Sequence, residues 1–306
     1  VNADLIIIGD APRQIEALAE WVGPSRIGLF AAGSVGYCAV DLARLGLRVS
    51  LLSSVADDLF GQWILNQLQA EGIDTQAMTI EKNATSGLAI FMLLFGSRKR
   101  PLTGRLASHP PWPAELSTLA EQRLQHARLL HCSGYLHYPQ IWGASTERLF
   151  QKARQDGLMT SLDPQFPVFP LKPPWLKFFG NLLQTVDFLF TDELEATSIT
   201  GVSDLEEAAK NLIEAGPKLV AIKRGPEGAL LMTKEKMIAQ PAFPVAEITD
   251  SIGAGDAFDA GMIYGLLADW PLEKSARFAA ALASLTLKGI GGTQTAAGLA
   301  EVQALL

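Results

Sequence analysis

Residues 247–267 read EITDSIGAGDAFDAGMIYGLL, and this stretch is the strongest local signal in the chain. A Gly-Ala-Gly turn stands between Asp250 and Asp256, and small and apolar residues continue from it at helical length. Glycine carries no Cβ, so the backbone of such a turn can come close to a ligand. A helix that begins near Ala254 would offer an anion its unpaired N–H groups and the positive end of its dipole. The stretch therefore predicts a phosphate-binding turn at Gly253–Gly255.

Two carboxylates beside this turn indicate a catalytic role in addition to anion binding. Asp256, in the first helical turn, is suited to take a proton from a substrate hydroxyl, a role worth about 100- to 10,000-fold in rate. Asp250, just before the turn, is suited to hold a nucleotide-bound Mg²⁺, because hard cations prefer oxygen ligands. A purely structural turn fits these residues equally well, since the dipole favours Asp in any first helical turn. No Gly-Lys-Ser/Thr follows the glycines, so the turn is not a P-loop.

Strand-like apolar runs alternate with helix-length segments along most of the chain. Such alternation predicts an α/β fold with a mainly parallel sheet and helices on both faces. The predicted strands are Asp4–Ile8, Arg48–Val55, Leu88–Phe95, Ala127–Cys132, Leu158–Asp163, Val186–Phe190 and Leu219–Lys223. The predicted helices, besides the one after the glycine turn, are Gly33–Leu45, Phe60–Glu71, Ala114–His126, Gly143–Gln155, Glu193–Thr200 and Leu205–Ala215.

The section from about residue 75 to 108 interrupts this alternation. It holds strand-like sequence with turn signals, KNATSG and FGSRKRPLTGR, and no helical pattern. We expect a small β appendage there, which is either an ordinary hairpin at a sheet edge or a lid over a ligand. The basic residues of this section, Arg98, Lys99, Arg100 and Arg105, suit an acidic or phosphorylated ligand, and they also suit an edge strand that avoids pairing.

Composition and charge limit the class of protein. The chain is 48% hydrophobic and 19% charged, as in globular proteins, and its net charge of −7 argues against a nucleic-acid or anionic-membrane partner. No run of about 18 apolar residues predicts a membrane span. Cys38 and Cys132 are too few for a disulfide framework, and VNADLIIIGDAP lacks a signal-peptide pattern; both fit a cytoplasmic protein. His131 and His137 lack metal-ligand spacing, so we expect them to be structural.

The stretch DSIGAGDAFDAG resembles the C-terminal signature of the PfkB, or ribokinase-like, family of carbohydrate kinases. That signature centres on Asp-Thr-x-Gly-Ala-Gly-Asp-x-Phe, and here Ser251 replaces the Thr. AAGSVGYCAVDLARLG and VADDLFG are similar to the Gly-rich turn, helix and loop of the family's first signature. The resemblance covers nearly the whole chain in family order. It implies one ribokinase-like domain over residues 1–306, with a β-lid formed by about 75–108, with or without part of the N-terminal region.

The resemblance implies a catalytic centre at the glycine turn. Asp256 matches the base that deprotonates the acceptor hydroxyl, and the family's anion hole corresponds to Gly253, Ala254 and Gly255. ATP and Mg²⁺ are the implied cofactors. The resemblance leaves open whether a monovalent cation activates the enzyme. The segment AAALASLTLKGIGG is similar to the wall that packs on adenine in relatives.

Two further elements match the nucleotide side of the family. TDELEA resembles an Asn-x-x-Glu element that organises Mg²⁺ and phosphate through water; Glu195 is kept and Asp192 replaces the Asn. KRGPEGALL resembles a nucleotide-side turn in which Gly225 and Gly228 are kept and Lys223 replaces the usual Thr. A Lys at this position would approach the triphosphate as a point charge.

The acceptor side departs from the family pattern. Gln14 stands near the place where relatives carry a sugar-binding Asp, and Asp10, which follows Gly9, is a second candidate for this role. In the Gly-Gly-x-x-x-Asn element, Gly33 is kept and Tyr37 replaces Asn; a Tyr can stack or make one hydrogen bond but cannot chelate a diol. DPQFP lacks the later Asn and Arg of an element that commonly reads Asp-x-Asn-x-Arg. With Arg100 of the lid, these residues are the expected acceptor contacts, and they argue against a simple ribose or fructose pocket.

The sequence thus predicts ATP-dependent phosphorylation of a hydroxyl, expected to be a primary alcohol, on a small sugar or sugar-derived acceptor. One alternative is a kinase of a nucleoside or hydroxymethyl heterocycle, which Tyr37 suggests. Another is a non-catalytic relative that senses a sugar or nucleotide, which the altered acceptor elements suggest. The resemblance also implies a homodimer through the lid, which the apolar run Leu88–Phe95 would permit.

Overall fold

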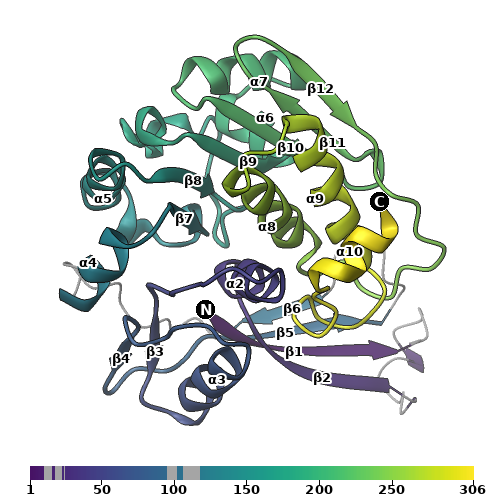
Figure 1. Cartoon of the computed structure of the whole chain (residues 1–306). Helices are drawn as coiled ribbons and strands as arrows, with labels where there is room; N and C mark the ends of the chain where they lie inside the picture. The colour runs from purple at the N-terminus through teal and green to yellow at the C-terminus, as the bar shows by residue number, and fades with distance from the viewer. Residues whose placement is uncertain (10–15, 18–22, 24, 95–101, 106–117) are drawn as a thin grey trace. The chain divides into compact units, whose positions relative to one another are not determined.

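Two units make up the chain in the computed structural model, which describes residues 1–9, 16–17, 23, 25–94, 102–105 and 118–306. Unit 1 consists of Val1–Pro111, Pro244–Ala260 and Ala281–Leu306, and unit 2 of Trp112–Phe243 and Gly261–Ala280. The chain therefore passes from one unit to the other inside helix α8 (Ala254–Leu267) and again inside helix α9 (Leu272–Thr286). Figure 1 shows the course of the chain from its purple N-terminus to its yellow C-terminus.

The core of unit 2 is a six-stranded sheet in the order β12-β11-β10-β9-β8-β7 (Figure 1). Its strands are β7 (Leu129–Ser133), β8 (Met159–Asp163), β9 (Phe188–Asp192), β10 (Leu219–Lys223), β11 (Ala229–Met232) and β12 (Met237–Gln240). Strands β7 to β10 are parallel, whereas β11 and β12 continue the sheet antiparallel. The parallel strands read as nearly continuous apolar runs, because parallel sheets are covered on both faces.

Helices lie before and between most of these parallel strands, as the alternation in the sequence predicts. Helix α4 (Thr118–Gln125) precedes β7, α5 (Ala144–Gln155) lies between β7 and β8, and α6 (Glu193–Thr200) and α7 (Leu205–Glu214) lie between β9 and β10. Helix α7 illustrates why these segments form helices. Asp204 caps it by accepting the Glu207 N–H at 2.9 Å, and its apolar side is buried. The α/β class with a mainly parallel sheet is confirmed. Within the described ranges, no helix combines the length and hydropathy needed to span a membrane.

Unit 1 contains a four-stranded sheet in the order β2-β1-β5-β6. Its strands are β1 (Asn2–Gly9), β2 (Ser25–Ala32), β5 (Leu88–Leu93) and β6 (Leu102–Arg105). Strand β1 is antiparallel to β2 and parallel to β5, so the first predicted strand pairs with the predicted lid and not within the parallel sheet. The sequence pattern missed β2, where Gly28 interrupts the apolar alternation. The ring of Phe30 fills the space that a Cβ of residue 28 would need.

The predicted strand Arg48–Val55 is wrong over most of its length. Only Ser54–Ala56 forms a strand, β3, which pairs in parallel with β4 (Thr79–Glu81). Before it, Ser50 makes an isolated bridge to Asp74. The partner segment then turns, with the Met78 N–H donating to Thr75 O at 3.0 Å, so the ladder is interrupted. The residue types at positions 48–53 favour a strand, but the segment after Asp74 turns and does not run alongside them.

Helices α2 (Ser34–Arg44) and α3 (Leu59–Ala70) contribute to the core of unit 1. The buried members of this core are Ala3, Ala39, Val40, Leu51, Val55, Ile64, Leu65, Leu68, Ile73, Met78 and Ala296. Asp58 begins α3 by accepting the Gly61 N–H at 2.7 Å. Arg44 Nη1 donates to Ala296 O at 2.7 Å, which ties α2 to the segment before helix α10 (Leu299–Leu305). The last part of the chain is therefore part of the same unit as the first.

Small residues allow helices α8 and α9 to approach closely within unit 2. A Cβ added at Gly261 would lie 2.5 Å from Cα and 3.0 Å from Cβ of Ala279. Farther along, the rings of Tyr264 and Phe278 are stacked, with centroids 5.2 Å apart. Gly261 therefore serves helix packing.

We expect Gly261→Ala to lower the free energy of unfolding by about 1–3 kcal/mol, because its methyl group would overlap the backbone of α9. Chemical denaturation with circular dichroism measures this change. Gly36→Ala in α2 is the matched control, since its Cβ would lie 3.4 Å from Val1 Cγ1, an ordinary contact. The control should change stability by less than about 1 kcal/mol. Equal effects of the two substitutions would contradict the close helix packing.

Candidate active site

The Gly-Ala-Gly turn lies at the start of helix α8. Gly253 has a φ of +83°, a left-handed conformation that favours glycine. The Ala257 N–H donates to Gly253 O at 2.8 Å and closes the first helical turn. A Cβ at residue 253 would lie 2.8 Å from Cα of Gly292, so the contact also requires glycine. The result is bare backbone at a helix N-terminus, where N–H groups and the dipole favour an anion.

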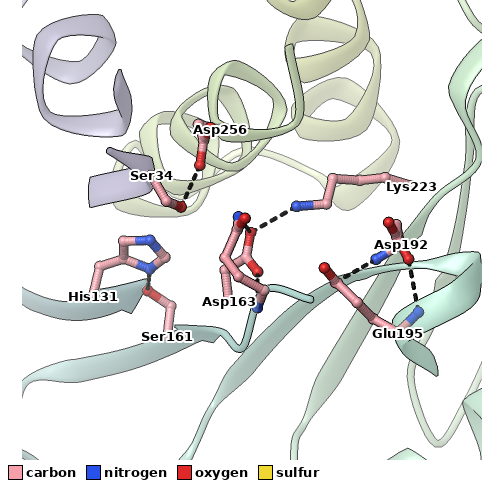
Figure 2. A network of polar contacts seen from close by, with 9 residues as sticks. Ser34, His131, Ser161, Asp163, Asp192, Glu195, Lys223 and Asp256 are labelled. Atoms are coloured by element: carbon pink, nitrogen blue, oxygen red, sulfur yellow. Dashed lines mark hydrogen bonds and ion pairs between the residues drawn. The ribbon is translucent and has the colours of Figure 1, made fainter. Parts of the chain in front are cut away.

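Asp256 lies in the first turn of α8, directly after these glycines. Its Oδ1 accepts a hydrogen bond from Ser34 Oγ at 2.5 Å (Figure 2). Ser34 is the first residue of α2, and Gly33 before it has a φ of +82°. Asp256 is 9% exposed, and the Ser34 hydrogen bond holds its carboxylate in place. This position is compatible with its predicted role as a base. Sequence reasoning missed Ser34, although a Ser directly after a glycine at a predicted helix start is a usable signal.

Asp250 braces the turn from within unit 1. It is 1% exposed; Oδ1 accepts the Ile252 N–H and Oδ2 accepts the Gly291 N–H, both at 3.0 Å. Burial raises the pKa of Asp250 above its usual value, while the backbone N–H donors oppose the shift. In this geometry both oxygens bind backbone, and the predicted contact with Mg²⁺ stays a prediction.

Tyr37 lies behind the turn. Its side chain is 4% exposed, and its hydroxyl donates to Asp4 Oδ2 at 2.5 Å. Burial, and then the negative charge of Asp4, raise the pKa of Tyr37 well above its usual value, so the phenol is neutral. A Cβ at Gly253 would lie 3.4 Å from the Tyr37 ring. The ring therefore faces the backbone of the turn. Sequence reasoning missed Asp4, although an Asp within an apolar strand is a usable signal.

Asp41, on the same helix as Ser34 and Tyr37, is a further buried carboxyl. It is 1% exposed, and its Oδ1 has no hydrogen-bond partner among the described residues. Burial, and then the charge of Asp256, raise the pKa of Asp41 well above its usual value; Arg44 acts in the opposite direction. A buried carboxyl without compensating bonds favours its protonated form.

Unit 2 carries the residues predicted for the nucleotide side. Lys223 Nζ lies 2.8 Å from Asp163 Oδ2, at the ends of β10 and β8 (Figure 2). The Asp163 side chain is fully buried and that of Lys223 is 13% exposed. Gln165 also donates to Asp163, through its backbone N–H and its Nε2, both at 3.0 Å. The Lys that replaces Thr thus neutralises a buried carboxylate, and its predicted contact with a triphosphate stays a prediction.

Asp192 and Glu195 form a capping box at the start of α6. Asp192 Oδ1 accepts the Glu195 N–H at 2.7 Å, and Glu195 Oε2 accepts the Asp192 N–H at 2.8 Å (Figure 2). Burial, and then the charges of Asp163 and Asp192, raise the pKa of Glu195 well above its usual value, against the effect of Lys223. The box uses one oxygen of each carboxylate. Oxygen donors of this kind fit Mg²⁺ held through water, although the described residues include no cluster of three metal-ligating side chains.

The remaining predicted site residues fall into two groups. Gly225 and Gly228 have φ values of +52° and +90° and border a short turn, where the Arg224 N–H donates to Gly228 O at 2.7 Å. A Cβ at residue 228 would overlap Gln240 O, so this glycine is needed for packing. Asp10, Gln14 and Arg100 lie outside the described residues, as do Arg13, Arg98 and Lys99. The side chain of Arg105 lies outside them as well.

His131 is enclosed in unit 2, as the sequence predicts for a structural histidine. A hydrogen bond of 2.9 Å links its Nδ1 with Ser161 Oγ (Figure 2), and its Nε2 is buried without a partner among the described residues. Burial lowers the pKa of His131 from 6.5 to about 4, although Asp163 acts in the opposite direction. The folded protein therefore holds this imidazole neutral.

Known proteins share the fold of the whole chain. A ribokinase from Arabidopsis thaliana, solved with ribose and ATP, matches with a TM-score of 0.79 at 22% identity and covers 99% of this chain and 95% of that one. The fold is therefore ribokinase-like. The model of the pfkB family carbohydrate kinases matches residues 2–297. The chain belongs to the pfkB family of carbohydrate kinases, which confirms the resemblance seen in its sequence and makes its class that of the sugar kinases.

Two curated relatives are similar over most of their length. A 5-dehydro-2-deoxygluconokinase from Geobacillus kaustophilus (strain HTA426) is 26% identical over 286 residues, which cover 90% of this chain and 84% of the relative. A 2-dehydro-3-deoxygluconokinase from Bacillus subtilis (strain 168) is 27% identical over 282 residues, which cover 87% of this chain and 84% of the relative. Both relatives are named as kinases of keto-deoxy sugar acids.

The lowered pKa of His131 predicts a pH-dependent stability. Below pH 6.5 the His131 imidazole binds a proton in the unfolded state, whereas in the folded state it stays neutral down to about pH 4. The free energy of unfolding therefore decreases as the pH is lowered from 6.5 to 4, by about 3 kcal/mol at 1.36 kcal/mol per pKa unit. His131→Asn, which keeps a partner for Ser161, should lose this component in denaturant titrations between pH 7 and pH 4. His126→Asn, at an exposed position, should keep the wild-type dependence. Parallel pH profiles of wild type and His131→Asn would contradict the interpretation.

Proposed function

We propose that the protein transfers the γ-phosphoryl group of ATP to a hydroxyl of a keto-deoxy sugar acid. The observation that carries the proposal is the Asp256 carboxylate, held by Ser34 beside the bare Gly253–Gly255 backbone. One group is suited to remove the hydroxyl proton, and the other to receive an anion. Their adjacency is what phosphoryl transfer to an alcohol requires.

Asp256, the backbone of the turn and Ser34 each have one role in the transfer. Asp256 orients the acceptor hydroxyl and takes its proton as the oxygen attacks phosphorus. The N–H groups of the first turn of α8 donate to the phosphoryl oxygens, whose negative charge spreads during transfer. Ser34 donates to Asp256 and so fixes the direction of the carboxylate. When bound, Mg²⁺ supplies further charge neutralisation at the phosphates, and Asp192 and Glu195 would hold it through their carboxylates.

The choice of a sugar acid rests on the relatives and on the acceptor elements. The curated relatives named above are keto-deoxygluconate kinases. The chain lacks the Asn and Arg expected for a simple sugar pocket, which agrees with an acceptor other than ribose. The alternative that Tyr37 stacks on a nucleoside base loses its support, because the ring is buried against Gly253 and Gly292.

Asp256→Asn should lower turnover by about 100-fold or more, because the amide cannot accept the proton. Acceptor-dependent ADP formation is measured with 5-dehydro-2-deoxygluconate, 2-dehydro-3-deoxygluconate, ribose and fructose 6-phosphate. Binding of a non-hydrolysable ATP analogue with Mg²⁺, followed by calorimetry, should stay within about 3-fold of wild type. Ser34→Ala, which keeps the base, should reduce turnover less. Near-normal turnover of Asp256→Asn would remove the base assignment, and a lack of acceptor-dependent ADP formation in wild type would favour the sensing alternative.

We also propose that two copies of the chain pair through the four-stranded sheet of unit 1. Register places six apolar residues on one face of its strands: Leu5, Ile7, Ile27, Leu29, Ile90 and Met92. Ile27 is 65% exposed and Leu29 is 38% exposed. Leu5, Ile7, Ile90 and Met92 are half-buried. A contiguous apolar patch that is partly exposed in this way is typical of an association surface.

Sedimentation analysis at micromolar concentration should show a dimer for the wild type and a monomer for Ile27→Glu, because the charge would be buried at the interface. Ile80→Glu is the matched control: Ile80 is 53% exposed on β4, outside the patch. The control should remain dimeric. A monomeric wild type, or a dimeric Ile27→Glu variant, would contradict pairing through this face.

A further inference from the structure

Tyr37 is enclosed although it follows the site residue Ser34 by less than one helical turn. Its hydroxyl donates to Asp4 Oδ2 at 2.5 Å, and Asp4 is itself 2% exposed and also accepts from the Asn2 side chain. A buried phenol and a buried carboxylate each need a partner, so their bond fixes both side chains. The pair links helix α2 to strand β1.

The Tyr37 ring contacts two backbone segments at once. A Cβ at Gly292 would lie 2.8 Å from Cδ1 and 3.1 Å from Cε1 of Tyr37, and a Cβ at Gly253 would lie 3.4 Å from Cδ1 and Cγ. The two glycines also touch each other, since a Cβ at residue 292 would lie 3.0 Å from Cα of Gly253. At this packing density the turn cannot move toward the ring, and neither glycine can be replaced without displacing it.

The segment at Gly291–Gly292 is held from other directions too. Asp250 Oδ2 accepts the Gly291 N–H at 3.0 Å. The ring of Phe30 lies beside Gly291, where a Cβ would be 2.6 Å from Cδ2 of the ring. The turn before α8 therefore rests on a support that is fixed by a carboxylate and two aromatic rings.

We propose that Tyr37, held by Asp4, is a positioning residue that sets the place of the Gly253–Gly255 backbone and of Asp256, and that it does not bind the acceptor. The proposal rests on the proposed function and deepens it. Among the described residues, the hydroxyl of Tyr37 donates to Asp4 and its ring packs against the two glycines. A displacement of about 1 Å in a catalytic geometry can cost about 100-fold in rate, so loss of this support should appear in turnover.

Tyr37→Phe tests the proposal, because it removes one oxygen and keeps the ring. We expect kcat to fall by about 10-fold or more while the KM for the acceptor changes by less than about 2-fold. Asp4→Asn keeps an acceptor oxygen for Tyr37 and should retain most of the turnover, whereas Asp4→Leu should resemble Tyr37→Phe. Tyr264→Phe makes the same chemical change in the unit 2 part of α8 and should leave both constants unchanged.

A second measurement needs no substrate. Hydrogen–deuterium exchange at the amides of residues 253–257 should become about 10-fold faster in Tyr37→Phe and stay at the wild-type rate in Tyr264→Phe, because the turn loses its support. If no acceptor is phosphorylated by the wild type, the proposed function fails, and the exchange rates still decide whether Tyr37 holds the turn.

Two results would overturn the proposal. A raised KM for the acceptor with unchanged kcat in Tyr37→Phe would show that Tyr37 binds the acceptor. Unchanged exchange at residues 253–257 would show that the hydroxyl does not hold the turn, whatever the kinetics.

Discussion

The contact between the backbones at Gly253 and Gly292 is the constraint on which the candidate active site depends. Only residues without a Cβ let the start of helix α8 lie against this segment and the Tyr37 ring. Asp250 reinforces the contact by accepting the Gly291 N–H. The contact fixes where α8 begins, and with it the place of the first helical turn and of Asp256. Ser34 then needs only one hydrogen bond to hold the carboxylate in place.

Local patterns predicted local features well and long-range partners poorly. Strand β10 occupies the predicted residues Leu219–Lys223, and the glycine turn does open a helix, because apolar runs and glycines act within a few residues. The sheet to which β1 belongs was not predictable, since its partner β2 carries a glycine in an apolar run. The bonds of Ser34 with Asp256 and of Tyr37 with Asp4 join residues 222 and 33 positions apart, and no local pattern reports them.

In unit 2, a lysine stands at a position where the family usually has a threonine, and it changes the balance of charges there. Lys223, in the place of a usual Thr, pairs with the buried Asp163. A buried ion pair is stable as a pair, but either partner alone leaves an uncompensated charge. Lys223 also lowers the pKa of Glu195, which burial and neighbouring carboxylates raise. One ammonium group therefore acts on both Asp163 and Glu195.

The division of unit 1 into three chain segments has a consequence for biosynthesis. Its strand β1 lies at the beginning of the chain, whereas Arg44 bonds to Ala296, 252 positions later. Such a contact closes only after residue 296 has left the ribosome, and contacts this distant in sequence slow folding. Most of unit 2 is translated before unit 1 can be completed. The Gly253–Gly255 turn therefore reaches its packed form only after Gly292 has been translated, later than most of unit 2.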